Sequence, residues 1–279
     1  MSGPGGVAAP APGGTDDPLA RNDLRGALEV AVARVKANPR EPGLRWLLAE
    51  LYLLSGETER ADRALDAILA EDPGPAVLEF RRLLRAEEAR RQTFRDGRLP
   101  RFQGDDPTPA QRAAMRALTL QRSGDLAGAA EAAAEAEALR PRVAGTANGD
   151  RPFDDFRDAD DLFAPHVEVL TAGGEYMWVP TERLASLVLD PVRRPRDLLW
   201  RRAALELRDG TEGVVFLHSV YPWSAPDTPD AIRLGRETDW TPEGEEGPVR
   251  GRGGRVWLAG EDALALSETT SLAFSAAAP

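Results

Sequence analysis

Four prolines recur at an identical spacing along the first half of the chain. Pro39, Pro73, Pro107 and Pro141 are each 34 residues apart. A fixed period of this size indicates that one supersecondary unit is repeated and that each unit buries its apolar face against its neighbours. Because proline cannot donate the next helical hydrogen bond, a proline at the same place in every unit indicates that a helix ends there. The period therefore predicts a stack of helical hairpins.

Small residues and turn residues keep the same register. Ala27, Ala61 and Ala129 align where two helices of a unit would cross closely, and Gly56 and Gly124 align in the turn before them. Thirty-four residues is the length of a tetratricopeptide repeat (TPR), which is a helix–turn–helix unit. The alignment predicts a first helix at about 22–38, a full unit at 42–75 and another at 110–143.

The unit at 76–109 departs from this pattern. Arg90 stands where the turn glycine is expected, and Arg95 stands where the small alanine is expected. Gly97 and Pro100 would also interrupt its second helix. We expect a longer helix near 75–95, followed by an irregular segment through Asp106.

The ends of the repeat region are marked by changes in composition. Residues 1–20 are rich in Gly, Pro and Ala. Such a segment cannot bury enough apolar surface to offset its ordering entropy, so we expect a disordered tail. We assign 21–141 to the TPR-like domain, 142–165 to an acidic linker, and 166–279 to a mainly-β domain.

The second half carries strand and hairpin signals. Residues 167–171 and 176–179 alternate in polarity around Gly173 and Gly174, and 204–208 and 214–217 flank Asp209-Gly210. Asp-Gly supports the positive φ values of a tight turn. Later strands are predicted at 255–258 and 271–274, with one helix near 227–236. The predicted fold class is α+β: a degenerate TPR-like solenoid followed by a small barrel or curled sheet.

Composition excludes several kinds of site and partner. The chain has no cysteine and two histidines, which excludes disulfides, thiolate chemistry and Cys- or His-rich metal centres. The net charge of −11 argues against nucleic acid as a partner. There is neither an apolar run long enough to cross a membrane nor an export signal, so we expect no membrane association. We predict no cofactor, no metal and no catalytic residues.

Two charged clusters remain to be interpreted. The acidic cluster lacks the loop spacing of a calcium site, so we interpret it as a solvated segment, with an acidic docking surface or a metal site as alternatives. The basic cluster is expected to pair with it across the domain junction, since arginine makes bidentate contacts with carboxylates. The acidic cluster is Asp150, Asp154, Asp155, Asp158, Asp160 and Asp161, and the basic cluster is Arg193, Arg194, Arg196, Arg201 and Arg202.

The concave face of the repeats is the candidate partner-binding site. Counting along the first helix of each unit places a largely apolar set of side chains there, which fits an amphipathic helix laid in a groove. The alternative is that the same residues are buried against the second domain. This predicted trough consists of Trp46, Glu50, Leu53, Leu54, Phe80, Leu84 and Leu118.

The chain resembles a known family over residues 21–274. A TPR-like half is followed by Phe153-Asp-Asp-Phe-Arg-Asp-Ala-Asp-Asp-Leu162, Tyr176-Met-Trp-Val-Pro180, Arg194–Arg201, Thr238-Asp-Trp240 and Leu272-Ala-Phe274. This arrangement is similar to the ImpE/TagJ accessory proteins of bacterial type VI secretion. The resemblance implies a non-enzymatic cytoplasmic adaptor that binds the N-terminal region of the small contractile-sheath subunit and contacts the ClpV disassembly ATPase, which is an AAA+ ATPase.

The alternative function is an enzyme or a small-ligand-binding protein with a site in the β domain. Such a site would draw on the two charged clusters. No G-x-S-x-G elbow is present, and neither His166 nor His218 has a catalytic partner at a recognisable spacing. We therefore expect both histidines to be structural or on the surface, and the protein not to be an enzyme.

Overall fold

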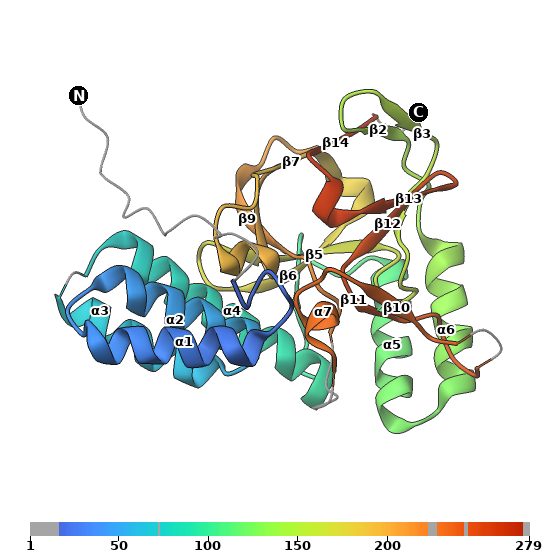
Figure 1. Ribbon diagram of the computed structural model, residues 1–279. Coiled ribbons are helices and arrows are strands. Elements are labelled where there is room, and N and C mark those ends of the chain that lie inside the picture. The colour runs from blue at the N-terminus through green and yellow to red at the C-terminus, as the bar shows by residue number, and fades with distance from the viewer. Residues whose placement is uncertain (1–16, 72, 223–227, 243–244, 276–279) are drawn as a thin grey trace.

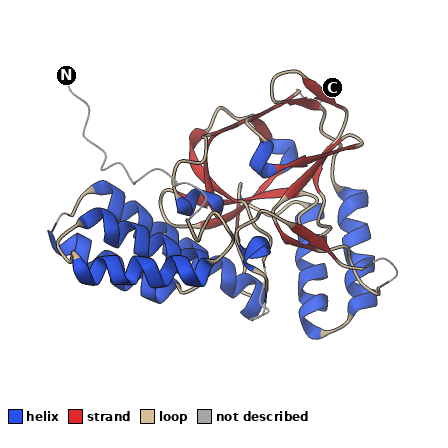
Figure 2. Cartoon of the chain, in the orientation of Figure 1, coloured by secondary structure: helices blue, strands red, loops and turns tan. Residues whose placement is uncertain are grey.

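The computed structural model describes residues 17–71, 73–222, 228–242 and 245–275. The sheet is curved, and helices α1 to α4 and the α5–α6 hairpin pack at the left and the right of the view on the same face of it (Figure 1). Helices and strands are thus segregated along the chain, which confirms the α+β fold class (Figure 2). The predicted tail lies outside the described residues, apart from 17–20.

The first four helices follow the predicted repeat. They are α1 (Leu24–Ala37), α2 (Pro42–Leu54), α3 (Thr58–Glu71) and α4 (Pro75–Asp96). The Asp23 side chain accepts the Gly26 N–H at the start of α1, and Pro42 and Pro75 begin their helices at a position where no donor is needed. Gly97 ends α4 in the left-handed conformation, with φ of 78°.

The predicted helix crossings are confirmed by the burial of the aligned alanines. Ala61 and Ala129 are both 0% exposed. We expect Ala61→Leu to overpack the crossing of α2 and α3 and to lower the free energy of unfolding by roughly 1–3 kcal/mol. Urea denaturation measures this loss. Ala70→Leu, at an exposed position of α3, is the control, and equal stability of the two variants would contradict the register.

The repeats do not form one continuous solenoid over 21–141. After α4, strand β1 (Arg101–Phe102) pairs in parallel with β6 (Tyr176–Pro180). The next hairpin, α5 (Pro109–Ser123) and α6 (Leu126–Leu139), consequently lies apart from α1 to α3, on the same face of the sheet (Figure 1). The break falls in the unit where a longer helix and an irregular segment were predicted, because the long α4 packs on the sheet instead of on a following repeat.

The predicted hairpins and later strands are confirmed, and the sheet is open. The main sheet runs in the order β1-β6-β5-β9-β8-β7-β14-β2-β3, and its edge strands β1 and β3 do not pair with each other among the described residues. The small barrel is therefore corrected to a curved open sheet. The other strands of this sheet are β2 (Gly145–Ala147), β3 (Arg151–Phe153), β5 (His166–Thr171), β7 (Leu184–Leu189), β8 (Trp200–Leu207), β9 (Glu212–His218) and β14 (Ser271–Phe274).

Two smaller sheets complete the fold. One pairs β10 (Thr238–Trp240) with β11 (Gly251–Gly253), and the other has the order β13-β12-β4. Its strands are β4 (Phe156–Asp158), β12 (Val256–Ala259) and β13 (Asp262–Ala265). The helix predicted near 227–236 is a single turn, α7 (Asp230–Arg233), and residue 227 lies outside the described residues.

The segment predicted as an acidic linker, 142–165, is folded. It contains β2, β3 and β4: β2 and β4 pair with β14 and β12 from the end of the chain, and β3 pairs with β2. These strands could not be predicted from the sequence, because three-residue strands are too short to show a clear period and Phe153 and Phe156 lie among acidic residues.

Both faces of the central sheet are buried. In β9, Phe216 packs into the cluster that includes the helices, whereas Val215 and Leu217 pack into a second cluster on the opposite face. This follows from the two-residue alternation of a strand. The helices therefore meet the sheet through a continuous apolar core, and that junction is where the predicted site lies.

Candidate functional site at the junction of the repeats and the sheet

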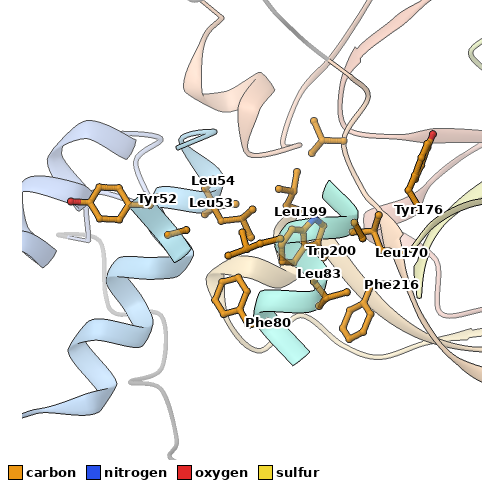
Figure 3. Close-up of a cluster of buried hydrophobic side chains, with 14 of the residues drawn as sticks. Tyr52, Leu53, Leu54, Phe80, Leu83, Leu170, Tyr176, Leu199, Trp200 and Phe216 are labelled. Carbon is orange, nitrogen blue, oxygen red and sulfur yellow. The ribbon is translucent and has the colours of Figure 1, made fainter. Parts of the chain in front are cut away.

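The predicted trough is covered by the chain itself. Phe80 of α4 stacks on Trp46 of α2, with ring centroids 5.7 Å apart, and meets the edge of Trp200 of β8 at the same separation. Figure 3 shows Phe80 and Leu83 beside Leu199 and Trp200, between the repeats and the sheet. The second domain thus fills the concave face of the repeats.

The prediction that the trough is open to a partner is wrong in this structure. Trp46 is partly buried, and the other six predicted residues are buried: Glu50, Leu53, Leu54, Phe80, Leu84 and Leu118. Leu118 lies on α5, in the separate helical hairpin at the right of Figure 1. The alternative of burial against the second domain therefore holds for the side chains of α2 and α4. A partner-binding role for them stays a prediction and requires the covering segment to move.

The covering segment is the β7–β8 loop, residues 190–199, which contains the short helix η2 (Pro195–Leu198). Arg194 Nε lies 2.5 Å from Glu50 Oε1, and its guanidinium lies over the Trp46 ring at 5.2 Å. Arg196 lies over the Phe80 ring at 5.1 Å, with Nη2 3.4 Å from Glu79 Oε1. Burial raises the pKa of Glu50 to about 7, against the opposing effect of Arg194 and Arg196. The loop thus contacts the repeats through two arginines.

The predicted pairing of the acidic and basic clusters is wrong. Strand β4 pairs with β12, so the aspartates face basic residues near the end of the chain and at the end of α6 instead. Asp158 and Asp160 are also buried, which excludes a wholly solvated segment. The observed ion pairs are Arg140–Asp155, Arg157–Asp161, Arg250–Asp160 and Arg255–Asp158 for the acidic cluster, and Arg194–Glu50, Arg196–Glu79 and Arg202–Asp190 for the basic cluster.

A second set of charged residues joins α4 to the sheet from inside the core. Arg90 Nε donates to Glu168 Oε1 at 2.9 Å, and Arg255 Nη1 donates to Asp158 Oδ2 at 2.6 Å. Arg255 also contacts Glu168 through Nη2 and donates to the backbone oxygen of His218 through Nε. We call this set the buried network, and each of its residues is at most 4% exposed: Glu87, Arg90, Asp158, Glu168, His218 and Arg255.

The charges of the buried network balance. His218 Nε2 lies 2.8 Å from Glu87 Oε2 and Nδ1 lies 2.7 Å from the Val220 oxygen, so both ring nitrogens face acceptors. This geometry places a proton between His218 and Glu87. Burial opposes ionisation of Glu87, but the facing His218 holds the pKa of that carboxyl below its usual range. This shared proton and the guanidinium groups of Arg90 and Arg255 face the three carboxylates, while burial and Arg90 lower the pKa of His218 itself.

The arrangement of the buried network is that of a structural joint. Burial acts to raise the pKa of Glu168, but Arg90 and Arg255 lower it to about 2. Within the described part of the chain, none of the buried side-chain polar atoms of these six residues lacks a hydrogen-bond partner. Each charged group is thus paired within the network, which leaves no acid, base or nucleophile directed at a ligand.

Comparisons with known proteins agree with this architecture. Residues 150–273 match the family model described as ImpE protein, and residues 19–84 match a tetratricopeptide repeat model. The chain is 32% identical over 247 residues to the type VI secretion system accessory component TagJ of Pseudomonas aeruginosa, covering 86% of this chain and 84% of that protein. The chain belongs to the ImpE/TagJ family. A crystal structure of a Vibrio parahaemolyticus protein shares the fold, with a TM-score of 0.83, 28% identity and coverage of 92% of this chain and 96% of that one.

The buried network of this ImpE/TagJ chain was missed by sequence reasoning, although one signal was present. Arg90 stands where the repeat calls for a small turn residue. A charged residue at a position that packing should fill indicates a partner elsewhere, here Glu168 at 78 residues' separation. Glu168 and Arg255 carried no signal, since each is one charge in an ordinary strand pattern.

Both histidines of this ImpE/TagJ chain are buried. His218 belongs to the buried network, and His166 stacks on Trp178 with ring centroids 3.8 Å apart. Burial lowers the pKa of His166 to about 3, so its ring is neutral.

The alternative function, an enzyme or ligand-binding site in the β domain, gains no support from the geometry. Two hollows in the described residues are lined by surface segments, one around Asp154 and Glu261 and the other around Arg85 and Leu99. Neither contains a histidine, and no group of three or more potential metal ligands converges within the described ranges. No described helix is long and apolar enough to cross a bilayer.

Proposed function

We propose that this ImpE/TagJ chain is an adaptor of type VI secretion. It acts in the cytoplasm, without catalysis, by binding the small subunit of the contractile sheath and the ClpV disassembly ATPase. The observation that carries the proposal is the likeness to the TagJ accessory component over 86% of the chain, which includes both the repeats and the sheet.

The architecture supports an adaptor. Tetratricopeptide hairpins commonly present surfaces to protein partners. Here the α1–α4 repeats and the α5–α6 hairpin lie apart, at the left and the right of the view in Figure 1, and both pack into the same apolar core. The net charge of −11 also favours protein over nucleic acid as the partner.

Calorimetric titration tests the proposal. The full chain is titrated with the purified sheath small subunit and, separately, with the N-terminal domain of the ATPase. We expect saturable binding to both, and loss of the first when the sheath subunit lacks its N-terminal region. Absence of binding to both partners would overturn the proposal.

A further inference from the structure

The β7–β8 loop is seated on the repeats as a short ligand would be. Its Arg194 and Arg196 meet one carboxylate and one aromatic ring each: Glu50 with Trp46, and Glu79 with Phe80. We call these four residues the α2–α4 seat. An acidic groove floored by aromatic rings recognises arginine through ion pairing and cation–π contact together.

The backbone of the loop is independent of the repeats. The Arg193 and Arg194 N–H groups donate to the Asp197 carboxylate, and the Asp197 and Leu199 N–H groups donate to carbonyls inside the loop. Among the described residues, no backbone hydrogen bond runs from 191–198 to α2 or α4. Side chains alone therefore hold the loop on the α2–α4 seat.

The contact is also incompletely satisfied. Arg196 Nη1 is buried without a hydrogen-bond partner, and the ion pair between Arg194 Nε and Glu50 Oε1 lacks hydrogen-bond geometry although the two atoms lie 2.5 Å apart. The buried network, in contrast, leaves none of its buried polar atoms unpaired in the described residues. A buried polar atom without a partner costs free energy, so the loop is the weaker of the two attachments between the repeats and the sheet.

We infer that the α2–α4 seat is a partner-binding groove that the chain's own β7–β8 loop occupies, and that a partner segment of the same chemistry displaces the loop. That segment carries two arginines two residues apart, followed by an apolar residue, as in Arg194-Pro-Arg-Asp-Leu198. This rests on the proposed function for the identity of the partner, but not for the occupancy of the seat.

A peptide in trans tests the occupancy without any secretion partner. The probe is a fluorescent peptide with the sequence of residues 190–201. We expect it to bind the variant Arg194→Ala/Arg196→Ala at least about tenfold more tightly than the unaltered chain, because the loop no longer competes for the seat. Adding Glu50→Gln to that variant should weaken the binding of the peptide again.

The matched control is Arg193→Ala/Arg202→Ala, which removes the same charge from exposed positions flanking the loop contacts. This variant should bind the peptide as weakly as the unaltered chain. Equal peptide affinity for all variants, with their melting temperatures unchanged, would overturn the inference. A loop variant that unfolds is replaced by Arg194→Gln/Arg196→Gln, which keeps the side-chain volume.

The N-terminal segment of the sheath small subunit is the second probe. It should bind the loop variant more tightly than the control by a similar factor. If the loop peptide behaves as expected and the sheath segment binds no variant, the inference about the α2–α4 seat is supported and the proposed partner is wrong. If the sheath segment binds every variant equally and the loop peptide binds none, the adaptor function is supported and the inference about the α2–α4 seat is wrong.

Discussion

Arg255→Met is expected to lower the free energy of unfolding by about 3–5 kcal/mol, because it leaves the buried Asp158 without its cation and Glu168 with Arg90 alone. Arg255 contacts both Asp158 and Glu168 and lies over the rings of Phe163 and Tyr221 at 4.6 and 4.9 Å. Methionine keeps much of the apolar contact, so the loss of unfolding free energy measures the effect of removing the charge. Urea denaturation at neutral pH measures it.

Arg252→Met is the matched control. Arg252 pairs with Asp239 at 3.0 Å, but about half of each side chain is exposed. Exposed pairs contribute about 0–1 kcal/mol, so this variant should be nearly as stable as the unaltered chain. Adding Asp158→Asn to Arg255→Met should recover part of the loss, since one uncompensated charge is removed. A loss below about 1 kcal/mol for Arg255→Met would show that the network is not a joint.

The contrast between the repeats and their attachment shows what sequence can predict. The proline period fixed the expected positions of α1 to α3 and the burial of Ala61 because repeat packing is local and recurs at a constant interval. The long α4 was also predicted, from the residues that break the pattern. The path of the chain after Gly97 was not, because β1 pairs with a strand about 75 residues later, and nothing in a two-residue strand signals its partner.

The candidate site illustrates the same limit. Repeat register correctly grouped Trp46, Glu50 and Phe80 on one face. It could not show whether a partner or the chain covers that face, because both need the same apolar and acidic side chains. The covering arginines are recognisable only once the β7–β8 loop is placed, since an arginine-rich loop is usually solvated.

The pH dependence of stability is expected to change when Glu50 is replaced by glutamine. Burial raises the pKa of Glu50 from 4.5 to about 7 in the folded chain. Between these values the folded carboxyl holds a proton that the unfolded chain has released, so unfolding releases protons. The corresponding stability is present below pH 4.5 and is lost as the pH rises through about 7. A difference of this size corresponds to roughly 3 kcal/mol.

Glu50→Gln removes this term because the amide does not titrate. The groups that face position 50 are Arg194, Arg196 and Asp197, and Asp158, whose pKa burial raises to about 6, is present in both proteins. Relative to the unaltered chain, the variant should therefore gain about 2–3 kcal/mol between pH 4.5 and pH 8 in urea denaturation. Glu29→Gln, at an exposed position of α1, is the control. A stability difference that stays constant with pH would mean that Glu50 is ionised and fully paired with Arg194 throughout, and the seat would then hold the β7–β8 loop by a strong ion pair.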